Sequence, residues 1–178
     1  MLASLVAHGR FLMDNLEVRD DGVTTNHYLA DLVGLLYLGL CLKEVREAEG
    51  WATFAVRALV REMDRQVLTD GVHYESSLSY HRLVTELFLY ALELGESNGL
   101  EVPPFARERL SAMFDYVRHY LKPDGHAPQI GDTDNGQLVV WAERQPTDHS
   151  YLLALAGSVF RASEFGFREP GGNPVAES

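Results

Sequence analysis

The sequence of 178 residues has few of the features that mark disulfide-rich or membrane proteins. Its single cysteine, Cys41, cannot form a disulfide within the chain. Cys41 lies in an apolar run at residues 35–42, so we expect a buried, unreactive thiol. The first ten residues do not resemble a signal peptide, and no apolar run is long enough to cross a bilayer. These observations leave the compartment open, and they give no reason to expect a membrane partner.

Basic residues are also scarce. The chain has 15 Lys and Arg against 26 Asp and Glu, which gives a formal net charge of −11 at pH 7. Nucleic-acid binding requires clustered Lys and Arg that neutralise phosphates, and here the basic residues are dispersed among acidic ones. The charge therefore argues against a nucleic-acid partner.

Apolar residues recur at helical spacing, and the alternation typical of β-strands is nearly absent before residue 138. We expect helices at residues 2–16, 26–47, 51–68, 76–95, 104–121 and 148–161. Asn26 is the expected N-cap of the second helix, Pro104 suits a first helical position, and Gly50 and Gly99 are the expected helix stops.

The second expected helix is apolar on nearly every side, whereas the third alternates apolar positions with Arg57, Arg61 and Arg65. This contrast indicates an inner helix and an outer helix. Antiparallel hairpins that alternate inner and outer helices build an α-solenoid or, when closed, an α/α toroid. We predict an all-α domain at residues 1–163, followed by a linker or frayed tail at residues 164–178.

Three Asp-Gly pairs begin at Asp21, Asp70 and Asp124, at intervals of 49 and 54 residues. Each pair follows a helix-like segment and precedes a dense polar run, at residues 24–28, 73–81 and 129–137. The regular interval predicts the same corner in each of three repeated units. Three polar runs should then meet at one end of the helical stack, where a rigid scaffold commonly carries a binding or catalytic site.

Two of these runs contain residues suited to act on an anionic ligand. Asn26 and His27 open an inner helix, whose N-terminus favours negative charge, although a capping Asn beside a surface His is the more common explanation of this spacing. Tyr80 and His81 point to different sides of a helix, so only one of them is expected to face a site, and aromatic core packing is an alternative for both. Glu75 could be an acid or base, or simply a charge that stabilises the first helical turn.

Other motifs carry little weight. Residues 131–136 superficially resemble a calcium loop, but position twelve, Glu143, has no clear exiting helix after it. Asp148, His149 and Ser150 have the residue types of a hydrolase triad, but adjacent residues cannot align as orienter, base and nucleophile. Because Cys/His metal spacings, phosphate loops and dinucleotide fingerprints are missing, we expect no metal and no cofactor.

Several segments taken together resemble the heparinase II/III family of polysaccharide lyases. They are NLE at residues 15–17, NHYLADLVGL at residues 26–35, DGVHYESSLSYH at residues 70–81, and PDG at residues 123–125 followed by Gly131 and Asp132. Their joint order and spacing, over roughly residues 10 to 137, are more specific than any single motif. The resemblance implies an α/α toroid followed by an antiparallel β-sandwich domain, with the active site between them. Residues 1–178 would then form an incomplete toroid that is weakly active or inactive alone.

The resemblance also implies roles for individual residues. Lyases of this family remove the C5 proton of a uronic acid in an acidic polysaccharide or oligosaccharide. Asn26 and His27 match the pair that neutralises the carboxylate, and Tyr80 matches the catalytic tyrosine. Residues expected to bind substrate are Glu75, His81, Arg82 and Asp132.

Two rival functions remain open at this point. A glycoside hydrolase on the same kind of toroid could use Glu75 and Asp132 as its carboxylate pair. A non-catalytic, acidic helical-repeat module could instead bind a protein or a glycan.

Overall fold

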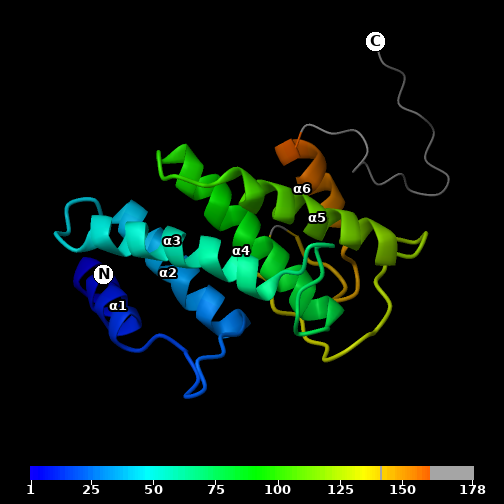
Figure 1. Cartoon of the computed structure of the whole chain (residues 1–178), viewed down its shortest axis with the longest axis horizontal. Helices are drawn as coiled ribbons and strands as arrows, with labels where there is room; N and C mark the ends of the chain where they lie inside the picture. Colours follow the sequence, from blue (N-terminus) through cyan, green and yellow to red (C-terminus); the bar gives the residue numbers. More distant parts are fainter. Residues whose placement is uncertain (141, 161–178) are drawn as a thin grey trace, which may run out of the picture.

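The computed structural model describes residues 1–140 and 142–160 and contains six helices in that part of the chain (Figure 1). They are α1 (Leu2–Asp14), α2 (Asn26–Cys41), α3 (Ala48–Gln66), α4 (Leu78–Ser97), α5 (Pro104–Tyr120) and α6 (Ser150–Phe160). All six expected helices are present, and β pairing in the described residues is limited to isolated bridges. Residue 161 and the tail predicted at residues 164–178 lie outside the described residues.

The helix ends agree with the sequence at Pro104 and differ from it at Gly50 and Asn26. Pro104 occupies a first helical position as predicted. Gly50 does not stop a helix but lies within α3, because α2 already ends at Cys41 and α3 begins at Ala48. Asn26 is not the N-cap of α2. Thr25 takes that role, and its hydroxyl accepts a hydrogen bond from the backbone N–H of His27.

The helices alternate between an inner and an outer layer. Helices α2 and α4 bury residues around much of their circumference, and α3 and α5 keep one charged face in solvent. Figure 1 shows the connections after α2 and α4 at the left-hand end of the molecule and those after α1, α3 and α5 toward its lower and right-hand side. The predicted arrangement of antiparallel hairpins is therefore confirmed.

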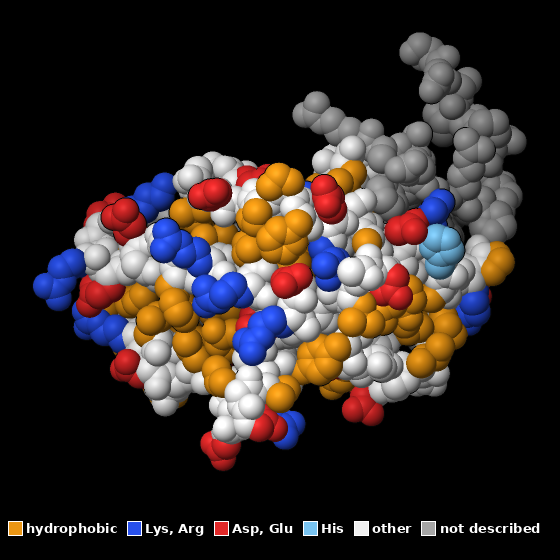
Figure 2. Space-filling model, viewed as in Figure 1, with side chains coloured by type: hydrophobic (Ala, Val, Ile, Leu, Met, Phe, Trp, Pro, Cys, Tyr) orange, Lys and Arg blue, Asp and Glu red, His pale blue; other side chains and the backbone are white. Residues whose placement is uncertain are grey.

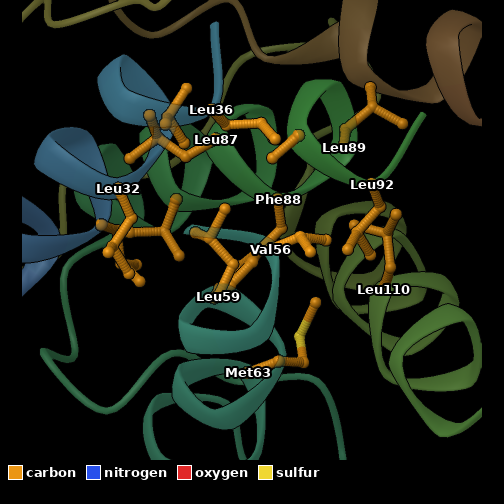
Figure 3. Packing of buried hydrophobic residues seen from close by; sticks show 14 of the residues in the cluster. Leu32, Leu36, Val56, Leu59, Met63, Leu87, Phe88, Leu89, Leu92 and Leu110 are labelled. Atoms are coloured by element: carbon orange, nitrogen blue, oxygen red, sulfur yellow. The ribbon is translucent and has the colours of Figure 1, made fainter. Parts of the chain in front are cut away.

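One apolar core joins the two layers. Figure 3 shows Leu32 and Leu36 of α2, Leu59 and Met63 of α3, and Phe88 of α4 directed into the same space. All five are fully buried. Burying a side chain of this size contributes about 1.5–3 kcal/mol, so the contact between layers supplies the rigidity that a site at one end requires.

Cys41 departs from the expectation of a buried thiol, because it is exposed. It is the last residue of α2, and the apolar run around it does not place every member in the core: Leu36 and Leu42 are buried on either side of it.

Charge is mixed on the surface. Figure 2 shows acidic and basic side chains interspersed over the face that it draws, including basic side chains along α3, where Arg57, Arg61 and Arg65 are exposed. No described helix is long and apolar enough to span a membrane. Within the described residues there is also no group of three or more His, Cys, Asp or Glu placed to hold a metal ion.

The three Asp-Gly corners share one geometry. Gly22, Gly71 and Gly125 all have positive φ, at 78°, 87° and 80°. Each donates its N–H to the carbonyl three residues earlier, and each preceding aspartate accepts the N–H two residues later through Oδ1. The repeated interval in the sequence thus corresponds to a repeated turn.

Candidate functional site

The start of α2 already holds a carboxylate. The backbone N–H of Asn26 donates to Oε1 of Glu75 at 2.9 Å, and Nδ2 of the Asn26 side chain donates to Oε2 at 2.8 Å. Backbone N–H groups in the first turn of a helix have no partner within the helix, and the helix dipole favours an anion there. Glu75 meets both requirements from the next repeat.

The turn that carries Glu75 is fixed against α2. The hydroxyl of Tyr74 donates to the carbonyl of Thr24 at 2.7 Å. Ser76 has φ of 59°, a left-handed conformation that is uncommon for a residue other than glycine, and its N–H donates to the carbonyl of His73. The backbone on both sides of Glu75 is therefore constrained, which holds its carboxylate toward Asn26.

Tyr80 lies at the start of α4 beside the third polar run. Ser77 caps this helix by accepting the N–H of Tyr80, and its hydroxyl donates to the carbonyl of Asp132 at 2.6 Å. The backbone of the loop packs closely here, since a Cβ at Gly131 would come within 2.7 Å of the Ser77 Cα. This contact places the loop of residues 129–137, the acidic loop that contains Asp132 and Asp134, against the end of α4 that carries Tyr80.

The acidic loop changes the chemistry of the phenol. The charge of Asp134, followed by smaller effects that include Asp132 and Glu75, raises the pKa of Tyr80 above its usual value near 10. Negative groups disfavour the phenolate, so the described surroundings argue against a Tyr80 phenolate acting as a base and leave the hydroxyl protonated near neutral pH.

Asn26, Glu75, Tyr80 and Asp132 are thus brought together, as the convergence of the polar runs predicted. Glu75 is bonded to Asn26, and the charges of Glu75 and Asp132 act on Tyr80. His27 is next to this cluster, but its exposed ring contacts Glu17, with Nδ1 2.8 Å from Oε2. No separate role was expected for Asp134 or Glu17, because the effect of Asp134 on Tyr80 and the contact of Glu17 with His27 do not follow from helical spacing.

His81 and Arg82 were expected to bind substrate, and the structure places both inside the protein. His81 is buried and its Nε2 donates to the carbonyl of Met113, so of the adjacent pair only Tyr80 is partly exposed. Burial lowers the pKa of His81 to about 3. The ring is therefore neutral near pH 7 and offers no positive charge to a ligand.

Arg82 is fully buried, and its guanidinium is used internally. Nη1 donates to the carbonyl of Pro146 at 2.8 Å, and Nη2 donates to the carbonyl of Gly136 at 2.7 Å. The expected contact between Arg82 and substrate is thus replaced by a contact that joins α4 to two parts of the long connection between α5 and α6.

A buried polar network lies behind the Asn26 cluster. Glu62 of α3 accepts hydrogen bonds from the Thr24 hydroxyl and from Nε2 of Gln66, and Oε1 of Gln66 accepts from Nε2 of His73. Burial lowers the pKa of His73 to about 4, so this imidazole is neutral near pH 7. The network connects α3 to the segments that follow the first two Asp-Gly turns and that carry Asn26 and Glu75.

The sequence Asp148-His149-Ser150 does not form a triad, as expected. Asp148 accepts from both the N–H and the hydroxyl of Ser150, whereas buried His149 bonds to the Tyr120 hydroxyl and to the Pro146 carbonyl. The imidazole is therefore directed away from the serine.

Two hollows lie away from the predicted site residues. One of about 460 Å³ is lined by α3 and by residues 99–103, toward the opposite end of the helices, and none of the predicted site residues lines it. The Asn26–Tyr80 cluster lies at the end of the helical layers, with Asn26 only 9% exposed, Glu75 and Tyr80 half-buried and Asp132 exposed. It combines an amide at a helix start with a protonated phenol, groups that can stabilise a carboxylate and deliver a proton.

The fold and site together define a class: a helical-hairpin protein of two layers, with polar turns gathered at one end. A family model described as "Heparinase II/III N-terminus" matches residues 1–151. The chain therefore belongs to the heparinase II/III family, as the sequence motifs predicted.

The chain is similar to three curated proteins named heparin-sulfate lyase. It is 29% identical over 101 residues to that of Bacteroides thetaiotaomicron, covering 56% of this chain and 14% of the relative. For Bacteroides stercoris the identity is 27% over 109 residues, with 60% and 16% covered. For Pedobacter heparinus it is 26% over 150 residues, with 79% and 23% covered. The chain thus spans less than a quarter of the length of each relative.

Solved structures support the fold. A crystal structure of heparinase III superimposes with a TM-score of 0.73 at 22% identity, covering 92% of this chain and 24% of that one. Heparan sulfate lyase HepC from Pedobacter heparinus gives 0.63 at 19% identity, covering 92% and 25%. The six helices are thus part of an α/α toroid, and the predicted all-α fold is confirmed.

Proposed function

We propose that the chain is part of a polysaccharide lyase that cleaves a uronic acid-containing polysaccharide by β-elimination. The proposal is supported by the family and by one observation above all. The Asn26 amide, at a helix start, bonds to Glu75, and two residues further on Ser77 joins the Tyr80 end of α4 to the loop of Asp132. The relatives are named as lyases of heparin sulfate, so an acidic glycosaminoglycan is the substrate class to test first.

In this reaction a base takes the proton from C5, and the electron pair forms the C4–C5 double bond. The C4–O4 bond breaks at the same time, and the leaving oxygen takes up a proton. The C5 proton is weakly acidic until negative charge developing on the carboxylate is stabilised, and preorganised donors supply that stabilisation. We assign it to Asn26, with His27 beside it.

Tyr80 is assigned as the proton donor to O4. Its hydroxyl is protonated near neutral pH, and the nearby carboxylates disfavour the phenolate, so the role of acid fits this residue better than that of base. The base at C5 is then expected from parts of the longer protein beyond these residues, such as the β-sandwich domain implied by the family. Asp132 borders the same surface and is proposed to face the substrate.

Product chemistry tests the proposal. The longer protein that contains this chain is incubated with heparan sulfate, and the products are examined for the ultraviolet absorbance of an unsaturated uronate. Elimination creates that chromophore, whereas a hydrolase using Glu75 and Asp132 creates new reducing ends without it. Tyr80→Phe should abolish most turnover while leaving substrate binding within about threefold, because the hydroxyl acts on proton transfer. Binding without either product would identify a non-catalytic module.

A further inference from the structure

Asn26 and Glu75 occupy equivalent positions in successive repeats. Each is the fifth residue after the aspartate of its Asp-Gly pair, at Asp21 and Asp70. Their side chains bond to each other, with Nδ2 of Asn26 2.8 Å from Oε2 of Glu75. Sequence reasoning expected Glu75 to touch substrate, and the structure directs its carboxylate at a neighbouring side chain instead.

We propose that Glu75 is a positioning residue, which fixes the Asn26 amide so that its second N–H faces the substrate carboxylate. This inference rests on the proposed function. A carboxylate only accepts hydrogen bonds, so the contact determines which end of the Asn26 amide turns toward Glu75: the nitrogen does. One hydrogen of Nδ2 is used by Glu75, and the other is assigned to the substrate, toward the 9% of Asn26 that is exposed.

Two acceptor oxygens are required for this role. Oε1 takes the backbone N–H of Asn26 at 2.9 Å while Oε2 takes the side chain, so backbone and amide are held as one unit. A glutamine at position 75 has a single acceptor oxygen and adds donors of its own. It has nearly the same size, but it cannot accept the two bonds on separate oxygens, and its own NH₂ can donate to the Asn26 oxygen, so the orientation of the amide is no longer defined.

Displacement of Glu75 by substrate is disfavoured. A substrate carboxylate that replaced it would make the same two bonds, with no gain in hydrogen bonding. Glu75 would also have to leave a turn held by the Tyr74–Thr24 bond and by the left-handed Ser76. Glu75 therefore stays in place while the substrate uses the remaining N–H. The repulsion between the charge of Glu75 and the substrate carboxylate is the unfavourable effect of this arrangement.

A double-mutant cycle in the longer protein tests this role. Asn26→Ala is expected to lower kcat on the free-acid polysaccharide by about 10²–10³, and to affect a methyl-ester substrate much less. Glu75→Gln is expected to lower kcat about 10–100-fold with KM within about threefold, as for other residues that orient a functional group. Because Glu75 acts through Asn26, the double variant should be no slower than Asn26→Ala alone.

Asp132→Asn is the matched control. It removes another negative charge close to Tyr80 without touching Asn26, so its effect should multiply with that of Asn26→Ala. If Glu75→Gln also multiplies with Asn26→Ala, Glu75 acts directly on substrate and the inference is overturned. A marked fall in KM for Glu75→Gln would also overturn it, because that result identifies Glu75 as a competitor for the carboxylate site.

A measurement on residues 1–178 separates this inference from the proposed function. The Nδ2 amide resonances of Asn26 are followed by NMR in the chain and in its Glu75→Gln variant. They should shift clearly in the variant, and unchanged resonances would refute positioning whatever the kinetics show. Shifted resonances together with an Asn26→Ala enzyme of full activity would instead refute the proposed role of Asn26 in catalysis.

Discussion

Tyr80 has three carboxylates near it, of which Asp134 has the largest effect on its pKa. The folded protein therefore holds the phenol protonated above its ordinary titration range. Asp134→Asn should move the pKa of Tyr80 downward, toward 10. The ¹³Cζ resonance of Tyr80 followed against pH measures this shift, with Tyr80→Phe used for assignment among the eight tyrosines. An unchanged or higher midpoint in Asp134→Asn would show that the loop charge does not act on this residue.

At the scale of the elements, the Asp-Gly turns offer a matched pair of substitutions. Gly22 and Gly71 have nearly the same φ, but a Cβ at Gly22 meets open space, whereas one at Gly71 would lie 2.2 Å from the Ala112 carbonyl oxygen of α5. Gly22→Ala should cost about 1–2 kcal/mol of unfolding free energy, from the left-handed backbone alone. Gly71→Ala should cost at least about 2 kcal/mol more, because the turn must move off α5. Urea unfolding of both variants measures the difference, and equal costs would contradict the close contact with α5.

Arg82 joins α4 to the connection between α5 and α6. Arg82→Ala should lower the free energy of unfolding by about 3 kcal/mol or more, because two buried carbonyls lose charge-assisted hydrogen bonds. Arg57→Ala, on the exposed face of α3, is the control and should stay within about 0.5 kcal/mol. Chemical denaturation provides both values. A small effect at Arg82 would mean that the connection is held by other contacts.

Features that depend on neighbouring residues were predicted, whereas contacts between distant segments were not. Helices and Asp-Gly turns were predicted because their signals, apolar periodicity and a residue pair that accepts positive φ, lie within a few neighbouring residues. The burial of Arg82 was missed because it depends on a connection 54–64 residues further on, and that of His81 because it depends on α5, where Met113 lies 32 residues away. The bond between Asn26 and Glu75 was missed for the same reason: the 49-residue interval predicted proximity but not which atoms would meet.

At the scale of the whole molecule, buried neutral histidines make stability depend on pH. Burial lowers the pKa of His73 and His149 to about 4 and that of His81 to about 3, against about 6.5 in the unfolded chain. Below pH 6.5 the unfolded chain takes up protons that the folded one does not, so stability is complete above that pH and is lost as the pH falls toward 4. Each histidine contributes about 1.4 kcal/mol per pH unit in this window. Glu86, whose pKa is raised by burial, opposes part of the loss.

Denaturation at pH 7, 6 and 5 tests this dependence. The wild type should lose stability at each step. In His73→Gln the unfolding free energy should change less steeply with pH, by the equivalent of one proton, whatever the stability of this variant at pH 7. A slope identical to that of the wild type would mean that His73 titrates normally in the folded protein.

The equivalence of Asn26 and Glu75 also bears on how such repeats can be altered. If both positions carried Asn, either end of each amide could face the other, so the orientation would not be defined. If both carried Glu, two carboxylates would face each other at hydrogen-bonding distance and repel. The defined orientation depends on neighbouring units carrying different residues at this position, where the last turn has Gln129. Consensus redesign, which makes repeats alike to gain stability, would here erase the asymmetry that orients the amide.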